Sequence, residues 1–196
     1  MTTKEKLLAL LEDSKGTFFS GEEIARTLQV SRAAVWKAVN ALREDGYTID
    51  AATNKGYRLS PDSDILSPQG IRRFLKPEYR DLDLTVLPTA PSTNALVREK
   101  ANQGRPEGCV IVACEQTAGR GRYGRQFFSP VDSGVYLSLL LRPTAYSPQQ
   151  ATCLTAAAAA AMCQAIEAVT GQQPGIKWVN DIFLHGKKVC GILTEA

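Results

Sequence analysis

Residues 20–59 are SGEEIARTLQVSRAAVWKAVNALREDGYTIDAATNKGYRL, and their pattern predicts the architecture of the first third of the chain. Ser20 and Glu23 have the spacing of a capping box and predict one helix start, and Ser31 predicts a second. Apolar residues recur at helical spacing after each start. A short alternating strand, the loop 53–56 with its Asn and Gly, and a second strand predict a hairpin.

A further helix is predicted before this stretch, because Leu7, Leu8 and Leu11 form an apolar stripe and Thr3 can cap it. The resulting order is helix, helix, short turn, helix and hairpin, which is that of a winged helix-turn-helix. We therefore predict such a domain over residues 1–62, followed by a linker with a short helix (65–76) over residues 63–80.

The outward face of the third predicted helix is suited to the major groove of DNA, because residues 24–43 carry four basic residues and no acidic one. The same pattern also fits a solvated helix face. An interaction module that touches no DNA, with Trp36 packed against the hairpin, is a further alternative. The predicted DNA contacts are Ser31, Arg32, Ala33, Trp36, Lys37 and Asn40 on the helix and Lys55 and Arg58 on the hairpin.

The composition of the 196-residue chain is that of a globular protein, with 44% hydrophobic and 22% charged residues and a net charge of +3. The longest uncharged run, residues 143–166, contains glutamines and many small residues, so we expect no membrane span. No signal-peptide core follows Met1. Five cysteines without a Cys-x-x-Cys pair argue against a disulfide framework or a zinc site. We therefore predict a cytoplasmic protein, and the cysteine pattern identifies no metal ligand among its side chains.

A second, mixed α/β domain is predicted from residue 81 onward. Its helices are expected over residues 95–101 and 151–169, with Ser92 or Thr93 as the cap of the first. Such a helix start could bind an anion, although a plain cap is the alternative. Its strands are expected at residues 84–87, 109–113 and 134–141, and as a pair around the turn His185-Gly186.

The loop Gly119-Arg-Gly-Arg-Tyr-Gly-Arg125 follows the buried strand 109–113. It matches the G-x-G-x-x-G pattern, but residues 127–130 indicate a strand and a turn where a dinucleotide site requires a helix. Glycines permit movement and arginines bind phosphate or carboxylate, so we expect a mobile loop that closes over a small anionic ligand. A Gly/Arg segment that binds nucleic acid is the alternative.

Four polar residues, Lys177, Asn180, Asp181 and Lys188, lie within or beside strong strand sequence. A buried charge is unfavourable unless it is paired or used, so these are candidate site residues.

Together these residues resemble the biotin protein ligases, specifically the bifunctional kind that also represses the biotin operon. Ser31–Ala34 and Asn54–Tyr57 also resemble the repressor. The other matching segments occur in family order, as Ser92-Thr-Asn94, Gln116, Gly119–Arg125, Phe128-Ser-Pro130, Lys177-Trp-Val-Asn-Asp181, and Lys188 with Gly191-Ile-Leu193.

This resemblance implies an α+β protein in which a winged helix-turn-helix precedes a mixed α/β-sheet catalytic domain of the biotin/lipoate ligase type. It implies biotin, ATP and Mg²⁺ as ligands, since the family forms biotinyl-5′-AMP and transfers biotin to a lysine of the biotin carboxyl carrier protein. It also implies a homodimer that binds operator DNA when loaded with the adenylate.

The resemblance assigns Lys188 and Arg120 to catalysis, where they would offset the repulsion between a carboxylate and an α-phosphate. Lys177, Asn180 and Asp181 would lie on the nucleotide and Mg²⁺ side. The residues that would bind biotin or its adenylate are Ser92, Thr93, Asn94, Gln116, Gly119, Arg120, Gly121, Arg122 and Lys188. Val179, Phe127 and Tyr123 stand where the family usually has Pro, Trp and a basic residue.

Members of the family continue past the position of Ala196 with more of the central sheet and a small β-barrel domain. Residues 81–196 are therefore expected to form the N-terminal portion of a catalytic domain that is incomplete at its C-terminus. A DNA-binding, biotin-responsive regulator without ligase activity is the alternative function. A lipoate ligase-like transferase is disfavoured by the winged helix and the Gly119–Arg125 loop.

Overall fold

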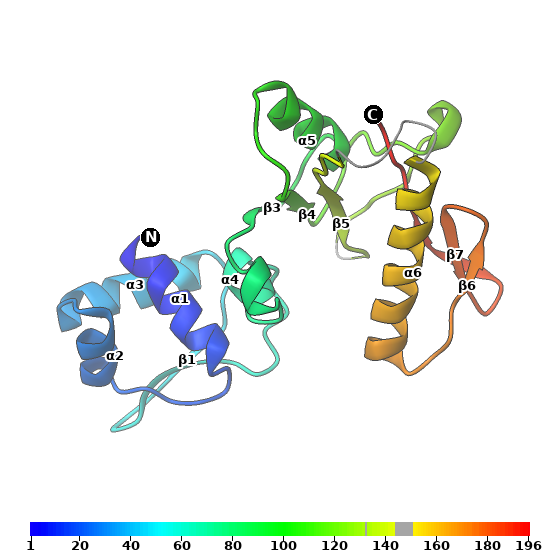
Figure 1. Cartoon of the computed structure of the whole chain (residues 1–196). Helices are drawn as coiled ribbons and strands as arrows, with labels where there is room; N and C mark the ends of the chain where they lie inside the picture. Colours follow the sequence, from blue (N-terminus) through cyan, green and yellow to red (C-terminus); the bar gives the residue numbers. More distant parts are fainter. Residues whose placement is uncertain (132, 144–150) are drawn as a thin grey trace. The chain divides into compact units, whose positions relative to one another are not determined.

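The structure is a computed structural model that describes residues 1–131, 133–143 and 151–196. It divides into two compact units, Met1–Leu82 and Asp83–Ala196 (Figure 1). The elements of the first unit are helices α1 (Thr3–Asp13), α2 (Gly21–Leu28) and α3 (Arg32–Glu44), strands β1 (Ile49–Ala52) and β2 (Gly56–Leu59), helix α4 (Pro68–Arg72) and the 3₁₀ turn η1 (Pro77–Tyr79).

The three long helices of the first unit begin where side chains satisfy free backbone N–H groups. Ser20 Oγ accepts from the Glu23 amide at 3.0 Å, and Ser31 Oγ accepts from the Ala34 amide at 3.2 Å, so both predicted caps are present. The predicted capping box at Ser20 is only half formed, because no hydrogen bond runs from the Ser20 amide to the Glu23 carboxylate. The cap of α1 is Thr2 rather than the predicted Thr3. Thr2 has the extended backbone that a cap requires, whereas Thr3 is already helical.

The hairpin packs against the helices around one apolar core. Ile49 of β1 lies opposite Leu59 of β2, and Phe19 and Tyr57 exchange two backbone hydrogen bonds of 2.9 Å that attach the hairpin beside the start of α2. The predicted winged helix-turn-helix is therefore confirmed. Its buried core residues are Leu7, Leu8, Leu11, Ile24, Ala25, Val35, Ala38, Val39, Leu42, Tyr47, Ile49 and Leu59.

The helix predicted over residues 65–76 is wrong in length, because only Pro68–Arg72 is helical. Ser67 caps it, accepting from the Gly70 amide at 2.9 Å. Gly70 disfavours the helical conformation near its centre, and Pro77 limits any extension, so no long helix forms.

Glu12 of α1 is a buried carboxylate beside this short helix, with only 3% of its surface exposed. Burial raises its pKa, an effect that outweighs the opposing influence of Lys15 and Arg73. Because the folded-state pKa is raised, the contribution to stability is complete at pH values below the unfolded-state pKa. It is lost as pH rises through the folded-state pKa.

Glu12→Gln is therefore expected to raise the thermal midpoint of the first unit by roughly 2–5 °C at pH 8, and to change it little at pH 4. Thermal unfolding of the whole chain followed by circular dichroism at both pH values measures this. A lower midpoint at pH 8 would mean that the Arg73 contact, at 3.8 Å, outweighs the effect of burial.

The described residues of the second unit form two three-stranded sheets, in the orders β3-β4-β5 and β6-β7-β8. The first sheet is mixed, since β4 pairs in parallel with β3 and antiparallel with β5. The second is antiparallel. The elements are β3 (Asp83–Leu87), α5 (Thr93–Asn102), β4 (Cys109–Ala113), the 3₁₀ turn η2 (Arg122–Gly124), β5 (Tyr136–Leu139), α6 (Ala151–Thr170), β6 (Gly175–Lys177), β7 (Asp181–Leu184) and β8 (Lys187–Gly191).

Each sheet has its own helix, as α5 packs on β4 and β5 and α6 packs on β6 and β7. The predicted turn between the last two strands is present, with His185 and Gly186 at φ values of 50° and 74°. Left-handed φ at both central residues is the geometry of a tight hairpin turn.

Helix α6 is long and apolar enough over Cys153–Thr170 to cross a membrane by length and composition. Only 11% of this stretch is buried inside the described structure. A single helix of this kind is weak evidence for a membrane span, because helices of globular proteins also meet these criteria. The absence of a span in residues 143–166 stays a prediction, and residues 144–150 lie outside the described part of the chain.

Candidate functional site

The start of α5 meets the segment that follows β4 through a set of neutral polar side chains. Ser92 caps the helix, accepting from the Ala95 amide at 3.4 Å, which decides between the two predicted caps. The amide and the hydroxyl of Thr93 both donate to Gln116 Oε1, at 2.8 and 3.1 Å. Gln116 Nε2 in turn donates to Ser129 Oγ at 3.1 Å.

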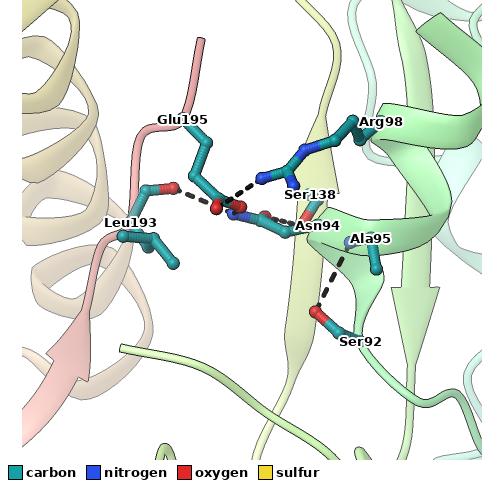
Figure 2. A network of polar contacts seen from close by, with 7 residues as sticks. All are labelled: Ser92, Asn94, Ala95, Arg98, Ser138, Leu193 and Glu195. Atoms are coloured by element: carbon teal, nitrogen blue, oxygen red, sulfur yellow. Dashed lines mark hydrogen bonds and ion pairs between the residues drawn. The ribbon is translucent and has the colours of Figure 1, made fainter. Parts of the chain in front are cut away.

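Asn94 extends this set to the end of the chain and to β5 (Figure 2). Its Nδ2 donates to the Leu193 carbonyl at 3.2 Å and to Glu195 Oε2 at 2.9 Å. The hydroxyl of Ser138 hydrogen-bonds Asn94 Oδ1 and lies 2.8 Å from Thr93 Oγ1. We call Ser92, Thr93, Asn94, Gln116, Ser129 and Ser138 the amide cluster.

Sequence reasoning did not include Ser129, Ser138 or Glu195 among the site residues. Ser138 carried a usable signal, because it is a small hydroxyl residue between two leucines of the strand Tyr136–Leu139, and it is buried. Ser129 belongs to the segment Phe128-Ser-Pro130, which resembles the biotin protein ligases but was not assigned a role. Glu195 had no local signal, since its partners Asn94 and Arg98 lie about a hundred residues earlier.

The amide cluster consists of hydroxyl and carboxamide groups, which can both donate and accept hydrogen bonds. Four of these side chains, Ser92, Thr93, Ser129 and Ser138, are buried. A partly buried neutral set of donors and acceptors suits a neutral planar group such as an amide or a urea better than an anion.

The glycine-arginine loop is anchored at its base by Gly119. The Phe127 amide donates to the Gly119 carbonyl at 2.9 Å, and the Gly121 amide donates to the Arg125 carbonyl at 2.7 Å. A Cβ on Gly119 would lie 2.4 Å from Phe127 O and 2.7 Å from Ser129 Oγ, so only glycine fits. The loop therefore lies directly against the amide cluster.

The tip of this loop forms the single 3₁₀ turn η2, with Tyr123 and Gly124 at positive φ. Within the described residues, the next regular element is the strand β5. The loop does not open a helix, which a dinucleotide site of this kind requires. The strand predicted at residues 127–130 is wrong, because only an isolated bridge at Ser129 forms there.

Charged side chains gather beside the loop in a second group, which we call the cationic cluster: Arg122, Asn180, Asp181 and Lys188. Arg122 Nη1 donates to Asn180 Oδ1 at 3.0 Å, and Asn180 Nδ2 donates to Asp181 Oδ1 at 3.1 Å. Lys188 Nζ lies 2.7 Å from the same Asp181 oxygen. The cluster holds two cations and one carboxylate, so it carries a net positive charge and suits an anionic ligand.

The two clusters meet at Phe127. Its backbone bonds Gly119, which lies against Ser129 of the amide cluster, and its ring lies 5.8 Å from Lys188 Nζ of the cationic cluster. Arg122 and Asn180 also line a pocket together with Val179 and the segment 192–194.

Two predicted site residues are not joined to the cationic cluster. Arg120 is exposed, and its backbone pairs with Gln126. Lys177 lies opposite Asp181 in the β6–β7 register, but its ammonium group lies 5.6 Å from the centre of the Phe183 ring. The residues 178–180 between these strands include a cis Trp178–Val179 peptide bond.

In the described part of the chain no three His, Cys, Asp or Glu side chains lie close enough together to hold a metal ion. Asp181 is the one carboxylate of the cationic cluster. A divalent cation there would depend mainly on oxygen atoms of its ligand, which is the usual mode of Mg²⁺ with phosphates.

The predicted DNA contacts lie on α3 and on the hairpin of the first unit. Ser31 is the cap of α3, Asn40 is half-buried, and the others on the helix are exposed. Trp36 keeps 62% of its surface exposed, so it does not simply pack against the hairpin. Lys55 is exposed, whereas Arg58 is ion-paired with Asp50 at 2.8 Å.

Comparison with known proteins gives two matches to family models. Residues 86–196 match the biotin/lipoate A/B protein ligase family, and residues 3–58 match an HTH domain.

Individual relatives cover most of the chain. The bifunctional ligase/repressor BirA of Bacillus spizizenii is 44% identical over 194 residues, which is 99% of this chain and 59% of that protein. The Escherichia coli protein of the same name is 34% identical over 194 residues, covering 99% and 58%. The solved biotin protein ligase from Aquifex aeolicus in complex with biotin and ATP aligns with 58% of this chain and 47% of its own, at 32% identity and a TM-score of 0.49.

The chain spans about 59% of the length of the first of these curated relatives. The ligase family model nevertheless matches more than half of the chain, over the same residues that hold the amide and cationic clusters. The chain therefore belongs to the biotin/lipoate A/B protein ligase family.

Proposed function

We propose that this protein is a biotin protein ligase that also binds operator DNA through its winged helix-turn-helix. The observation that carries the proposal is the meeting of the amide cluster and the cationic cluster at Phe127. Biotin has a neutral urea ring at one end and a carboxylate at the other. The amide cluster suits the first, and the cationic cluster suits the second together with the phosphates of ATP.

In the proposed reaction, a biotin carboxylate oxygen attacks the α-phosphorus of ATP and the bond to pyrophosphate breaks. Both reactants are anionic, so Lys188, Arg122 and, after loop closure, Arg120 would offset their repulsion. The amine of a lysine on the biotin carboxyl carrier protein then attacks the acyl carbon of biotinyl-5′-AMP. AMP leaves and the amine loses a proton, so no protein nucleophile is needed.

The metal that fits this reaction is Mg²⁺ bound chiefly to the nucleotide phosphates, with Asp181 and Asn180 as the neighbouring oxygen ligands. It would neutralise phosphate charge. The Asp181 carboxylate would then be a ligand of the metal as well as the ion-pair partner of Lys188. Lys177 would lie on the nucleotide side.

We also propose a function for each part of the chain. Residues 1–62 would bind DNA, and residues 81–196 would form the N-terminal portion of the catalytic domain. Residues 63–80 would be the linker between these two domains. The family resemblance further supports a ligand-bound homodimer and a cytoplasmic location without membrane contact. A regulator that binds biotin but lacks ligase activity is the competing function, and no specific contact favours it.

Calorimetric titration with biotin, first alone and then with Mg·ATP, tests the proposal when the bound ligand is afterwards identified by mass. Biotinyl-5′-AMP in the complex is the expected result. Biotin bound without adenylate would support the regulator instead. No binding by a chain with a cooperative thermal transition would contradict both functions of the second unit.

Lys55→Ala is expected to weaken binding to all DNA duplexes by a similar factor, because an exposed hairpin lysine contacts phosphate rather than bases. The slope of log K against log salt concentration should fall in magnitude by about one. Fluorescence anisotropy over a series of salt concentrations measures both quantities.

Arg58→Ala is the matched comparison on the same hairpin. Both cations lie over the Phe18 ring, at 5.9 Å for Lys55 and 4.7 Å for Arg58. The guanidinium group of Arg58 is in addition ion-paired with Asp50, so its loss should change the salt slope less. An affinity loss confined to one operator sequence in the Lys55 variant would contradict the assignment of Lys55 to phosphate.

A further inference from the structure

The outward face of α3 has an ordered arrangement of chemical types. Buried Val35, Ala38, Val39 and Leu42 define the core side of the helix. At about 100° per residue, and apart from Arg43 and Glu44 in the last turn, the opposite side presents five side chains in a fixed angular order. That order is Arg32, Trp36, Asn40, Ala33 and Lys37.

The two cations are therefore at the edges of this face, about 140° apart at that helical angle. Between them lie an indole, an amide and a methyl group. Trp36 is the one large apolar side chain of α3 that is exposed, and every residue of this helix is among those described. An indole kept in water at the centre of a polar face needs an apolar partner to be buried.

Trp36 and Ala33 also line a groove whose other wall is the hairpin, at Ala51–Asn54. The hairpin wall carries the exposed Lys55 at its end. The start of α2, with Glu22, and Arg32 complete the lining. The side of the groove formed by α3 is thus mostly apolar, and its margins carry two cations and one acid, which fits a duplex whose phosphates flank an apolar group on the base edges.

The major groove offers a single apolar group on its base edges, the C5-methyl of thymine. Asn40 lies beside Trp36 in the angular order, and a carboxamide suits adenine, the base that pairs with thymine. An A·T pair can therefore contact both Trp36, through the thymine methyl, and Asn40, through the adenine edge. The two cations remain free to contact phosphates on either side.

We propose that Trp36 is a specificity-determining residue that reads thymine by packing on its methyl group in the major groove. This inference rests on the proposed DNA-binding function. It adds to that function the base that is read, thymine, the group on that base, the C5-methyl, and the side chain that reads it, Trp36.

The test uses a duplex selected by the whole chain from a random library, with biotin and Mg·ATP present throughout. Each thymine of that duplex is then replaced in turn by deoxyuridine, which lacks only the methyl group. We expect one or two replacements to lower the affinity of the wild-type chain about 3- to 5-fold, the effect of burying one methyl group.

Trp36→Ala should bind the parent duplex more weakly and should no longer distinguish thymine from deoxyuridine at those positions. Trp36→Phe should retain part of the discrimination, because it keeps an aromatic surface. Since Trp36 is largely exposed, both variants should keep the wild-type thermal midpoint.

Lys37→Ala is the matched control on the same face. It should weaken binding and reduce the salt slope but keep the ratio of affinities for thymine and deoxyuridine. An unchanged ratio in Trp36→Ala, or no effect of any deoxyuridine on the wild-type chain, would overturn the inference while leaving DNA binding intact. Failure to select any duplex would overturn the DNA-binding function itself and the inference with it.

Discussion

Lys188→Ala is expected to slow the formation of biotinyl-5′-AMP by about 10²- to 10³-fold, the usual effect of removing one preorganised charge-stabilising group. The lysine lies 2.7 Å from Asp181 at the junction of the two clusters. Its loss removes a cation that would offset the repulsion between the two reacting anions. It also leaves the Asp181 carboxylate without its ion-pair partner. Both effects raise the barrier to attack on the α-phosphorus.

Single-turnover formation of the adenylate, with saturating biotin and Mg·ATP, measures this rate. Lys187→Ala is the control, because Lys187 is an exposed neighbour beside the turn and no ion pair among the described residues involves it. A loss of less than about 3-fold in Lys188→Ala would remove Lys188 from the chemistry of this step.

Gly119→Ala is expected to weaken biotin binding by at least about 10- to 100-fold, because displaced site groups lose hydrogen bonds that each contribute about 1 kcal/mol or more. The added Cβ would lie 2.4 Å from a backbone oxygen and 2.7 Å from Ser129 Oγ. The backbone oxygen cannot rotate away, so the loop base has to move. Ser129, the partner of Gln116, has to move with it.

Overpacking of this kind destabilises a fold by about 1–3 kcal/mol, so the thermal midpoint of the second unit should also fall. Calorimetry with biotin and a thermal scan of the same sample measure both effects. Gly175→Ala is the control, since no atom lies within 4 Å of its Cβ position and its φ is not left-handed. An unchanged affinity and midpoint in Gly119→Ala would contradict the tight approach described for Gly119.

The first unit was predictable because its signals are local. Ser20 and Ser31 start helices with their own neighbours, and Asn54 and Gly56 supply the positive φ of a short loop. The two errors were also local. Thr2 and Thr3 differ by one position in a sequence that suits both as caps, and the apolar residues of 65–76 overstated a helix that Gly70 and Pro77 limit.

The site was only partly predictable, because its contacts are between distant segments. The roles of Thr93, Gln116 and Lys188 came from a resemblance, and they stay predictions here. Ser138 meets Asn94 across 44 residues and Glu195 meets it across 101, and no periodicity encodes such pairs. The Arg58–Asp50 ion pair was accessible in principle, since the hairpin register places these residues opposite each other.

The internal hydrogen bonds of the amide cluster bear on how the site selects among related compounds. Thr93, Gln116 and Ser129 already satisfy one another. If the proposed function is right, a ligand with a urea group would exchange these bonds for its own. Its affinity would then depend on how well the new hydrogen bonds replace the old ones. A compound without such a group would leave the existing bonds in place, so no buried polar group would lose its partner. It would bind more weakly only because it forms no new hydrogen bonds with the site. Discrimination against such analogues should therefore be graded with the number of urea hydrogen bonds that each one retains.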